Sequence, residues 1–322
     1  MAIINVDDAY ILNEVGAQVD KTTGIPFKNE SLTEAEAAQA RANIRAGGSN
    51  RNLLDNAYFV GGGSQLGDGI FPINQRGQTS YGASTRAFDR WITESGSSVT
   101  LSSNGATFSG STVSLYDGAA AANLVGKTVT ISAQLGDGTI ISGTGVVNLL
   151  SQDTTIQAWL PTGGYVGFFI FANAQSYQFC RIYSGSATLI RAVKLELGTV
   201  STLANDPPPD FGEELRKCQR YLWCKTFPQY TQIGTGVATD ANNCVIDVVL
   251  PATMRTGATI TFTANVLLIG AGGAIVAASV SAINIIDNHA RINAVAASSM
   301  VTHNTYSFIT SAETTMTISA EL

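Results

Sequence analysis

The sequence predicts a mainly β protein: an N-terminal peptide and one short helix, then two β-sandwich or jelly-roll domains, assembled as a fibrous, modular homotrimer. Three observations predict this class. Short apolar or alternating runs recur after residue 52 and are separated by Gly, Asn and Asp turns. One segment alone has strong helical composition. Charged residues make up 13% of the chain, about half of the usual ~25%.

The first 51 residues are expected to serve attachment and assembly. Residues 1–30 are interpreted as a peptide ordered by a partner, with one or two helical turns over residues 9–19. A helix is predicted over residues 31–46, because Ser31 and Glu34 form a capping box, alanine dominates and Gly47 follows. Residues 31–51 thus comprise this helix and a flexible linker. One face of the predicted helix carries a narrow stripe of small and apolar residues, Leu32, Ala35, Ala38 and Ala42. This stripe is expected to pack against the same helix of other subunits in a homotrimer, and the alternative is that the helix docks on its own domain.

Residues 52–204 are predicted to form the first β-domain, and residues 227–322 a smaller second β-domain at the tip. Between them, residues 205–226 contain a proline-rich linker, NDPPPD, and a short helix over residues 213–221. In the first domain, strands are predicted at 97–102, 106–116, 128–135, 155–160, 165–172 and 190–197. In the second domain, they are predicted at 243–250, 259–264, 274–280, 290–296 and 314–320.

Composition argues against two classes of partner. The longest apolar stretch, residues 260–286, is interrupted by Asn and Gly residues, so it resembles strands and not a membrane-spanning helix. The net charge is −6 and there is no run of Lys and Arg, whereas nucleic-acid binding needs clustered positive charge. The N-terminus has neither the basic nor the apolar region of a secretion signal. We therefore expect no nucleic acid, no membrane insertion and no secretion signal.

The sequence lacks a recognisable catalytic constellation. Its two histidines, His289 and His303, have no second histidine at metal-ligand spacing, and no GxSxG motif is present. Of the acidic residues that could pair for glycoside hydrolysis, Asp117 and Asp137 lie next to glycine, as turn residues do. We therefore expect no enzyme, no catalytic metal and no cofactor. The GDG segments at 67–69 and 136–138 are interpreted as turns, with a structural calcium as the alternative, and residues 270–273 as a hairpin turn.

The segment from 52 to 91 combines aromatic, amide and arginine side chains, which suits stacking on sugar rings and hydrogen bonding to hydroxyls. Part of it, residues 74–76 and 89–91, is interpreted as structural, with Trp91 in the core and Asp89 paired to an arginine, and ligand binding is the alternative. Trp223 and Phe227 are expected to pack in the second domain, whereas residues 300–308 look like an exposed loop. The residues kept as ligand-binding candidates are Tyr58, Phe71, Tyr81, Arg86, His303 and Tyr306.

The four cysteines do not have the spacing of a zinc site or a CxxC redox pair. Free, partly buried thiols are one interpretation. The other is a disulfide that involves Cys218, Cys224 or Cys244, within or between subunits.

Several segments resemble bacteriophage and prophage tail-fibre and receptor-binding proteins. LTEAEAAQARANI (32–44) resembles a helix near the start of such fibres, and NLLDNAYF…INQRGQTSYGASTRAFDRW (52–91) the opening of a jelly-roll domain like those of carbohydrate-binding modules. VKLELGTVSTL (193–203) is similar to its closing strand. ELRKCQRYLWCKTF (214–227), LPATMRTGATITFTA (250–264) and TMTISAEL (315–322) resemble parts of the C-terminal domain of the same proteins. The extra GGGSQLGDGIF (61–71) departs from the family pattern.

The resemblance implies a virion fibre protein, assembled in the host bacterial cytoplasm and exposed extracellularly after release. Residues 1–30 would attach it to other virion proteins, and its β-domains would recognise a host-surface glycan. The alternatives are a purely structural or decorative fibre of the collar, head or tail, and a polysaccharide-degrading tailspike.

Overall fold

The computed structural model describes residues 10–12, 18–20, 50–63, 66–117, 123–148, 156–170, 177–255, 258–286 and 288–320. Residues 1–48 and 49–322 form separate units. In the first unit, β1 (Tyr10–Leu12) and β2 (Gln18–Asp20) pair antiparallel. The prediction of helical turns over residues 9–19 was therefore wrong for these two segments. The predicted helix at 31–46, with Leu32, Ala35, Ala38 and Ala42, lies outside the described residues.

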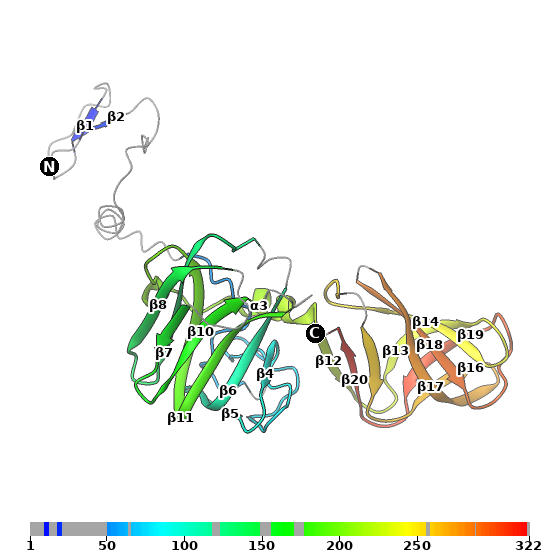
Figure 1. The fold of residues 1–322 in the computed structure, drawn as a ribbon. Coiled ribbons are helices and arrows are strands. Elements are labelled where there is room, and N and C mark those ends of the chain that lie inside the picture. Colours follow the sequence, from blue (N-terminus) through cyan, green and yellow to red (C-terminus); the bar gives the residue numbers. More distant parts are fainter. Residues whose placement is uncertain are drawn as a thin grey trace. The chain divides into compact units, whose positions relative to one another are not determined.

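The prediction of a mainly β protein is confirmed (Figure 1). A nine-stranded antiparallel sheet forms the first β-domain, and its central strand, β11, pairs with β6, β7 and β10. A register shift between Ser184 and Thr188 interrupts the pairing of β11 with β6. The strands are β3 (Ser80–Tyr81), β4 (Trp91–Thr93), β5 (Ser98–Ser102), β6 (Gly105–Asp117), β7 (Thr128–Leu135), β8 (Ile140–Val146), β9 (Ile156–Trp159), β10 (Gly164–Ile170) and β11 (Tyr177–Leu197).

The core of this domain is built from alternate residues of its strands. In β5, Val99 and Leu101 are buried while their neighbours are exposed, the period-two pattern of a strand with one wet face. The same holds for β9, where Ile156 and Ala158 face the core. On the opposite face, Trp159 of β9 and Tyr183 of β11 are exposed.

A linker and a short helix follow the sheet. After η1 (Leu203–Asn205), three prolines precede α3 (Phe211–Gln219). Asp210 caps the helix, since its side chain accepts a hydrogen bond from Glu213 N at 2.7 Å. The predicted helix at 213–221 is thus present, shifted by two residues toward the N-terminus.

The C-terminal part is a closed six-stranded barrel with a small three-stranded sheet, which differs from the predicted sandwich. The sheet order is β12-β20-β15, and the barrel order is β13-β14-β18-β17-β16-β19. β12 begins at Leu222, before residue 227, and pairs with β20, so the C-terminal sheet begins earlier than predicted. The bounds are β12 (Leu222–Phe227), β13 (Gln232–Ala238), β14 (Asn243–Val249), β15 (Thr259–Phe262), β16 (Val266–Gly270), β17 (Gly273–Ile286), β18 (His289–Ala296), β19 (Thr305–Thr310) and β20 (Thr314–Ser319).

One predicted loop is a strand of this barrel. Within 300–308, β19 alternates with Tyr306 and Phe308 buried. The polar residues around them hid this alternation in the sequence. By contrast, the turn predicted at 270–273 is present, because Gly270 pairs with Gly273 across the tip of the β16–β17 hairpin.

Candidate functional site

The polar and aromatic residues of segment 52–91 lie mostly inside the first β-domain. Trp91 is buried, and its indole Nε1–H donates to Asn56 O at 2.9 Å. Tyr81 is buried as well, and its hydroxyl donates to Asn74 Oδ1 at 2.6 Å. Burial raises the pKa of Tyr81 to about 12, since a phenolate would lose its hydration there. Tyr81 is thus a core residue with its hydroxyl satisfied internally, and it offers no exposed surface to a ligand.

Asp89 organises a second part of the same segment. Its buried carboxylate accepts hydrogen bonds from Gln75 N at 3.1 Å and Gln75 Nε2 at 2.7 Å, and Arg76 Nη1 lies 3.5 Å away. Gln75 also donates to Leu222 O and accepts from Cys224 N. These contacts agree with the interpretation of residues 74–76 and 89–91 as structural, because they join distant segments of the backbone.

The remaining candidates are scattered. Phe71 is buried and packs edge-on against Tyr58, their ring centroids 5.4 Å apart. Arg86 is half-buried. Tyr306 is buried with its hydroxyl accepting from Val301 N, whereas His303 is exposed. Phe71, Tyr81 and Tyr306 are thus buried. Tyr81 in β3 and Tyr306 in β19 occupy strand positions that face the core, whereas Phe71 precedes β3.

The cysteines are free thiols in the described chain. Cys180, Cys218 and Cys244 are buried, and Cys224 is half-buried. Burial raises the pKa of the thiols of Cys180, Cys218 and Cys244 above the usual value. Among the residues that the structure describes, no three His, Cys, Asp or Glu side chains come together as a metal site.

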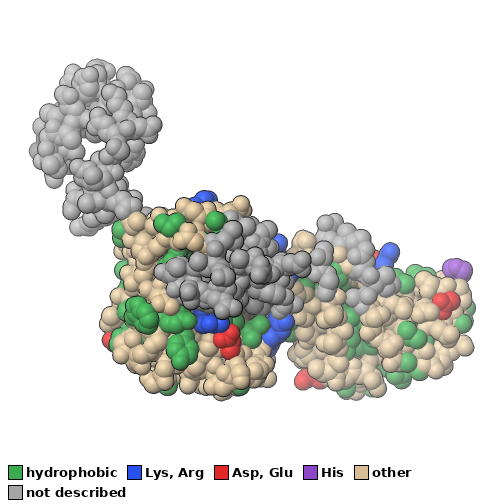
Figure 2. All heavy atoms as spheres, viewed as in Figure 1, with side chains coloured by type: hydrophobic (Ala, Val, Ile, Leu, Met, Phe, Trp, Pro, Cys, Tyr) green, Lys and Arg blue, Asp and Glu red, His purple; other side chains and the backbone are tan. Residues whose placement is uncertain are grey.

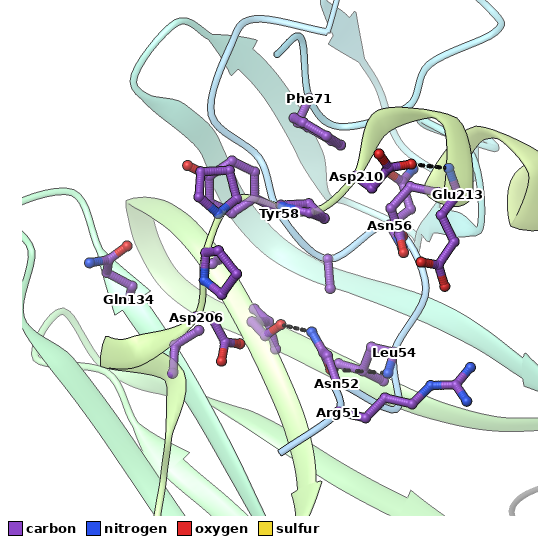
Figure 3. A pocket seen from close by; sticks show the side chains of 18 of the residues that line it. Arg51, Asn52, Leu54, Asn56, Tyr58, Phe71, Gln134, Asp206, Asp210 and Glu213 are labelled. Atoms are coloured by element: carbon purple, nitrogen blue, oxygen red, sulfur yellow. Dashed lines mark hydrogen bonds between the residues drawn. The ribbon is translucent and has the colours of Figure 1, made fainter. Parts of the chain in front are cut away.

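A cavity of about 510 Å³ lies beneath the proline linker (Figure 3). Tyr58 and Phe71 lie on one side of it, and Asn52 and Leu54 on the other. Its charged groups mostly serve the fold. Asp206 pairs with buried Lys194 at 2.5 Å, and Asp210 caps α3. Glu214 accepts a hydrogen bond from Asn56 N and pairs with Lys217. The cavity therefore lies where the sheet, the proline linker and α3 meet.

A different surface carries aromatic side chains that the core does not use. Trp159, Tyr165 and Tyr183, here called the aromatic row, are aligned by strand pairing. Tyr165 of β10 is the register partner of both Trp159 in β9 and Tyr183 in β11. The ring centroids are 6.0 Å apart for Trp159–Tyr165 and 5.8 Å for Tyr165–Tyr183. Trp159 is 67% exposed and Tyr183 is 45% exposed, so the row is open to solvent.

The aromatic row continues into polar side chains. Ser111 of β6 is the register partner of Tyr183, and Glu94 N, just after β4, donates to Ser111 O at 2.8 Å. The Ser111 hydroxyl also donates to Glu94 Oε2. Arg181, two residues before Tyr183 on the same face, donates from Nη2 to Glu94 Oε1 at 3.0 Å. Ser111, Glu94 and Arg181 are here called the polar end.

The polar end borders a shallow depression of about 670 Å³, whose lining includes Glu94, Ser111, Ile92 and Val113. Ile92 and Val113 are register partners, so the depression lies over the β4–β6 pair. On the face of the first β-domain turned to the viewer, Figure 2 shows hydrophobic side chains beside blue and red ones. Rings, hydroxyls, a carboxylate and a guanidinium thus meet on one sheet surface, which is the candidate functional site.

None of the residues of the aromatic row was predicted from the sequence to bind a ligand. Trp159 and Tyr165 both lie within predicted strands and flank a tight turn, in which Gly163 N donates to Leu160 O. Trp159 occupies an outward position in the alternation of β9. A large aromatic at an outward position is the signal that could have been used. Its alignment with Tyr183 depends on strand pairing, which the sequence does not display.

Comparison with known proteins adds no relative. No family model, curated protein or solved structure matches this chain. Within the described residues, no helix has both the length and the apolar character needed to cross a membrane.

Proposed function

We propose that this chain is a bacteriophage virion fibre protein that recognises a host-surface glycan. The observation that carries the glycan part is the solvent-exposed aromatic row of Trp159, Tyr165 and Tyr183. Aromatic faces stack on the C–H surfaces of sugar rings, and an exposed row of three rings is unusual for a plain spacer. The virion part rests on the sequence resemblance to phage fibre and receptor-binding proteins.

The polar end supports the same proposal. Glu94 accepts hydrogen bonds, Arg181 donates them, and the Ser111 hydroxyl does both. Sugar hydroxyls need this mixture of donors and acceptors beside an apolar stacking surface. Along the row and the polar end, Glu94 is the one carboxylate among the described residues, whereas most glycosidases need two. The arrangement therefore favours binding over hydrolysis.

Weak binding by one chain is compatible with the proposed role. We propose a homotrimer, attached to other virion proteins through residues 1–30, that presents three copies of the site. Linking several sites raises the overall avidity by orders of magnitude when they can engage together. Light scattering tests this assembly, and a monomeric mass would refute the trimer.

The glycan proposal is tested with an array of bacterial surface polysaccharides probed with the full chain. Trp159→Ala and Tyr183→Ala are the test variants, and Tyr230→Ala is the matched control, because Tyr230 is 69% exposed but lies outside the row. Loss of binding in the first two variants and retention in the third would support the proposal. A wild-type chain that binds no glycan would favour the structural or decorative fibre instead. Binding that survives both row variants would move the site elsewhere.

A further inference from the structure

We infer that the polar end makes the site selective for neutral sugars and excludes sugars that carry a carboxylate. This inference rests on the proposed glycan function and names the class of ligand for the same site. It depends on the position of Glu94, which lies at the end of the aromatic row and holds the guanidinium of Arg181.

The distances show that the positive charge of Arg181 is already balanced. Its Nη2 lies 3.0 Å from Glu94 Oε1, and the other oxygen of Glu94 accepts the Ser111 hydroxyl. The side chains of Arg181 and Glu94 are 27% and 39% exposed. Both side chains are therefore accessible to a ligand. They are also partly buried, so solvent screens their charges less and charge interactions at short range are stronger.

The chain pairing places this ion pair next to the sugar path. Arg181 and Tyr183 lie on the same face of β11, two residues apart, and Ser111 is directly opposite Tyr183. A sugar stacked on Tyr183 would thus bring its substituents to Ser111, Arg181 and Glu94. The neighbouring depression is floored by Ile92 and Val113, which offer C–H surface and no charge.

The chemistry of these groups distinguishes two ligand classes. A pair of neighbouring hydroxyls can donate to Glu94 and accept from Arg181, so a neutral sugar satisfies both groups without breaking their ion pair. A sugar carboxylate can only accept hydrogen bonds, and it would be repelled by the carboxylate of Glu94, which lies beside the guanidinium. The net charge of −6 adds repulsion at longer range. Neutral sugars should therefore bind more tightly than their acidic counterparts.

The decisive variant is Glu94→Gln. Glutamine keeps the size and the acceptor for Ser111, and the backbone hydrogen bond from Glu94 N to Ser111 O is unaffected. It removes the negative charge that lies beside the guanidinium of Arg181. Glu313→Gln is the matched control, because it removes the same charge from an exposed position in the C-terminal part.

The probes are cellohexaose, laminarihexaose and mannohexaose, each beside its form oxidised at C6 to the uronate. Calorimetry on the full chain measures the ratio of neutral to acidic affinity. We expect wild type and Glu313→Gln to favour the neutral probe, and Glu94→Gln to bind the uronate roughly tenfold more tightly than wild type does, as one repelling charge at close range allows. High salt should reduce the ratio of neutral to acidic affinity in wild type. This measurement needs no variant.

The outcomes separate the two proposals. Equal wild-type affinity for neutral and acidic probes would overturn the selectivity inference while leaving glycan binding intact. An unchanged ratio in Glu94→Gln would also overturn it. Absence of binding to every probe and to the polysaccharide array would overturn the proposed function itself, and the inference with it.

Discussion

Replacing Tyr81 with phenylalanine removes one buried hydroxyl and tests whether this residue serves the fold. The hydroxyl donates to Asn74 Oδ1 at 2.6 Å, and both side chains are buried. The Asn74 amide is held by Gly63 O and Gln78 O, so the acceptor cannot turn to another donor without losing these bonds. An unsatisfied buried acceptor costs about 1–3 kcal/mol. Tyr81→Phe should therefore lower the free energy of unfolding by that amount at pH 7.

The pH dependence sharpens this prediction. Burial raises the pKa of Tyr81 to about 12 from 10, so above pH 10 the unfolded chain releases the proton while the folded chain retains it. Stability contributed by the neutral hydroxyl is complete below pH 10 and is lost as the pH rises through about 12. Two pKa units correspond to about 3 kcal/mol. The advantage of wild type over Tyr81→Phe should shrink over this range.

Urea unfolding at several pH values is the assay, with a lower midpoint and an unchanged m-value expected for the variant. If the difference in unfolding free energy between wild type and Tyr81→Phe stayed constant from pH 9 to about 12, the assignment of this pH dependence to the Tyr81 hydroxyl would be refuted. Unchanged stability at pH 7 combined with lost glycan binding would restore Tyr81 as a ligand residue and refute its place in the core.

Three further predictions concern packing, polar contacts and thiols. Gly143→Ala should lower the free energy of unfolding by about 1–3 kcal/mol, because its Cβ would lie 1.9 Å from a backbone oxygen of β9. Gly82 has open space around it, so Gly82→Ala should change the stability little in the same urea assay. Gln75→Ala removes a bridge between the first β-domain and β12 and should cost about 1–3 kcal/mol, whereas exposed Gln78→Ala should be close to neutral by differential scanning calorimetry. A thiol reagent should modify Cys224 first in the folded chain and all four cysteines after denaturation, and a disulfide found by non-reducing mass spectrometry would contradict the free thiols.

The sequence reveals elements that depend on local pattern. Strands such as β7 and β14 have apolar or alternating residues between clear turn signals, and their bounds lie within a residue of the prediction. The helix α3 was predicted from its composition, but its start was placed two residues late because the cap at Asp210 was assigned to the linker. β19 was missed because Thr and Asn residues surround its two aromatics. The barrel closure was missed because it depends on which strands pair, a property of the whole chain.

The candidate site shows the same limit more strongly. Its outward aromatics belong to three strands, and the part of β11 that holds Tyr183 was not predicted as a strand. Glu94 and Arg181 are 87 residues apart in the chain. Their meeting follows from the register of β4, β6 and β11. Composition can suggest sugar binding, but long-range pairing determines which residues share a surface.

The most direct test of the glycan site is acrylamide quenching of tryptophan fluorescence. The chain has three tryptophans, and Trp159 is 67% exposed while Trp91 and Trp223 are 1% and 8% exposed. Trp159 should therefore supply the accessible part of the emission. A saturating glycan should cover its ring and abolish this accessible part, and Trp159→Phe should lack it from the start. A glycan that binds the chain but leaves the quenching unchanged would contradict the site.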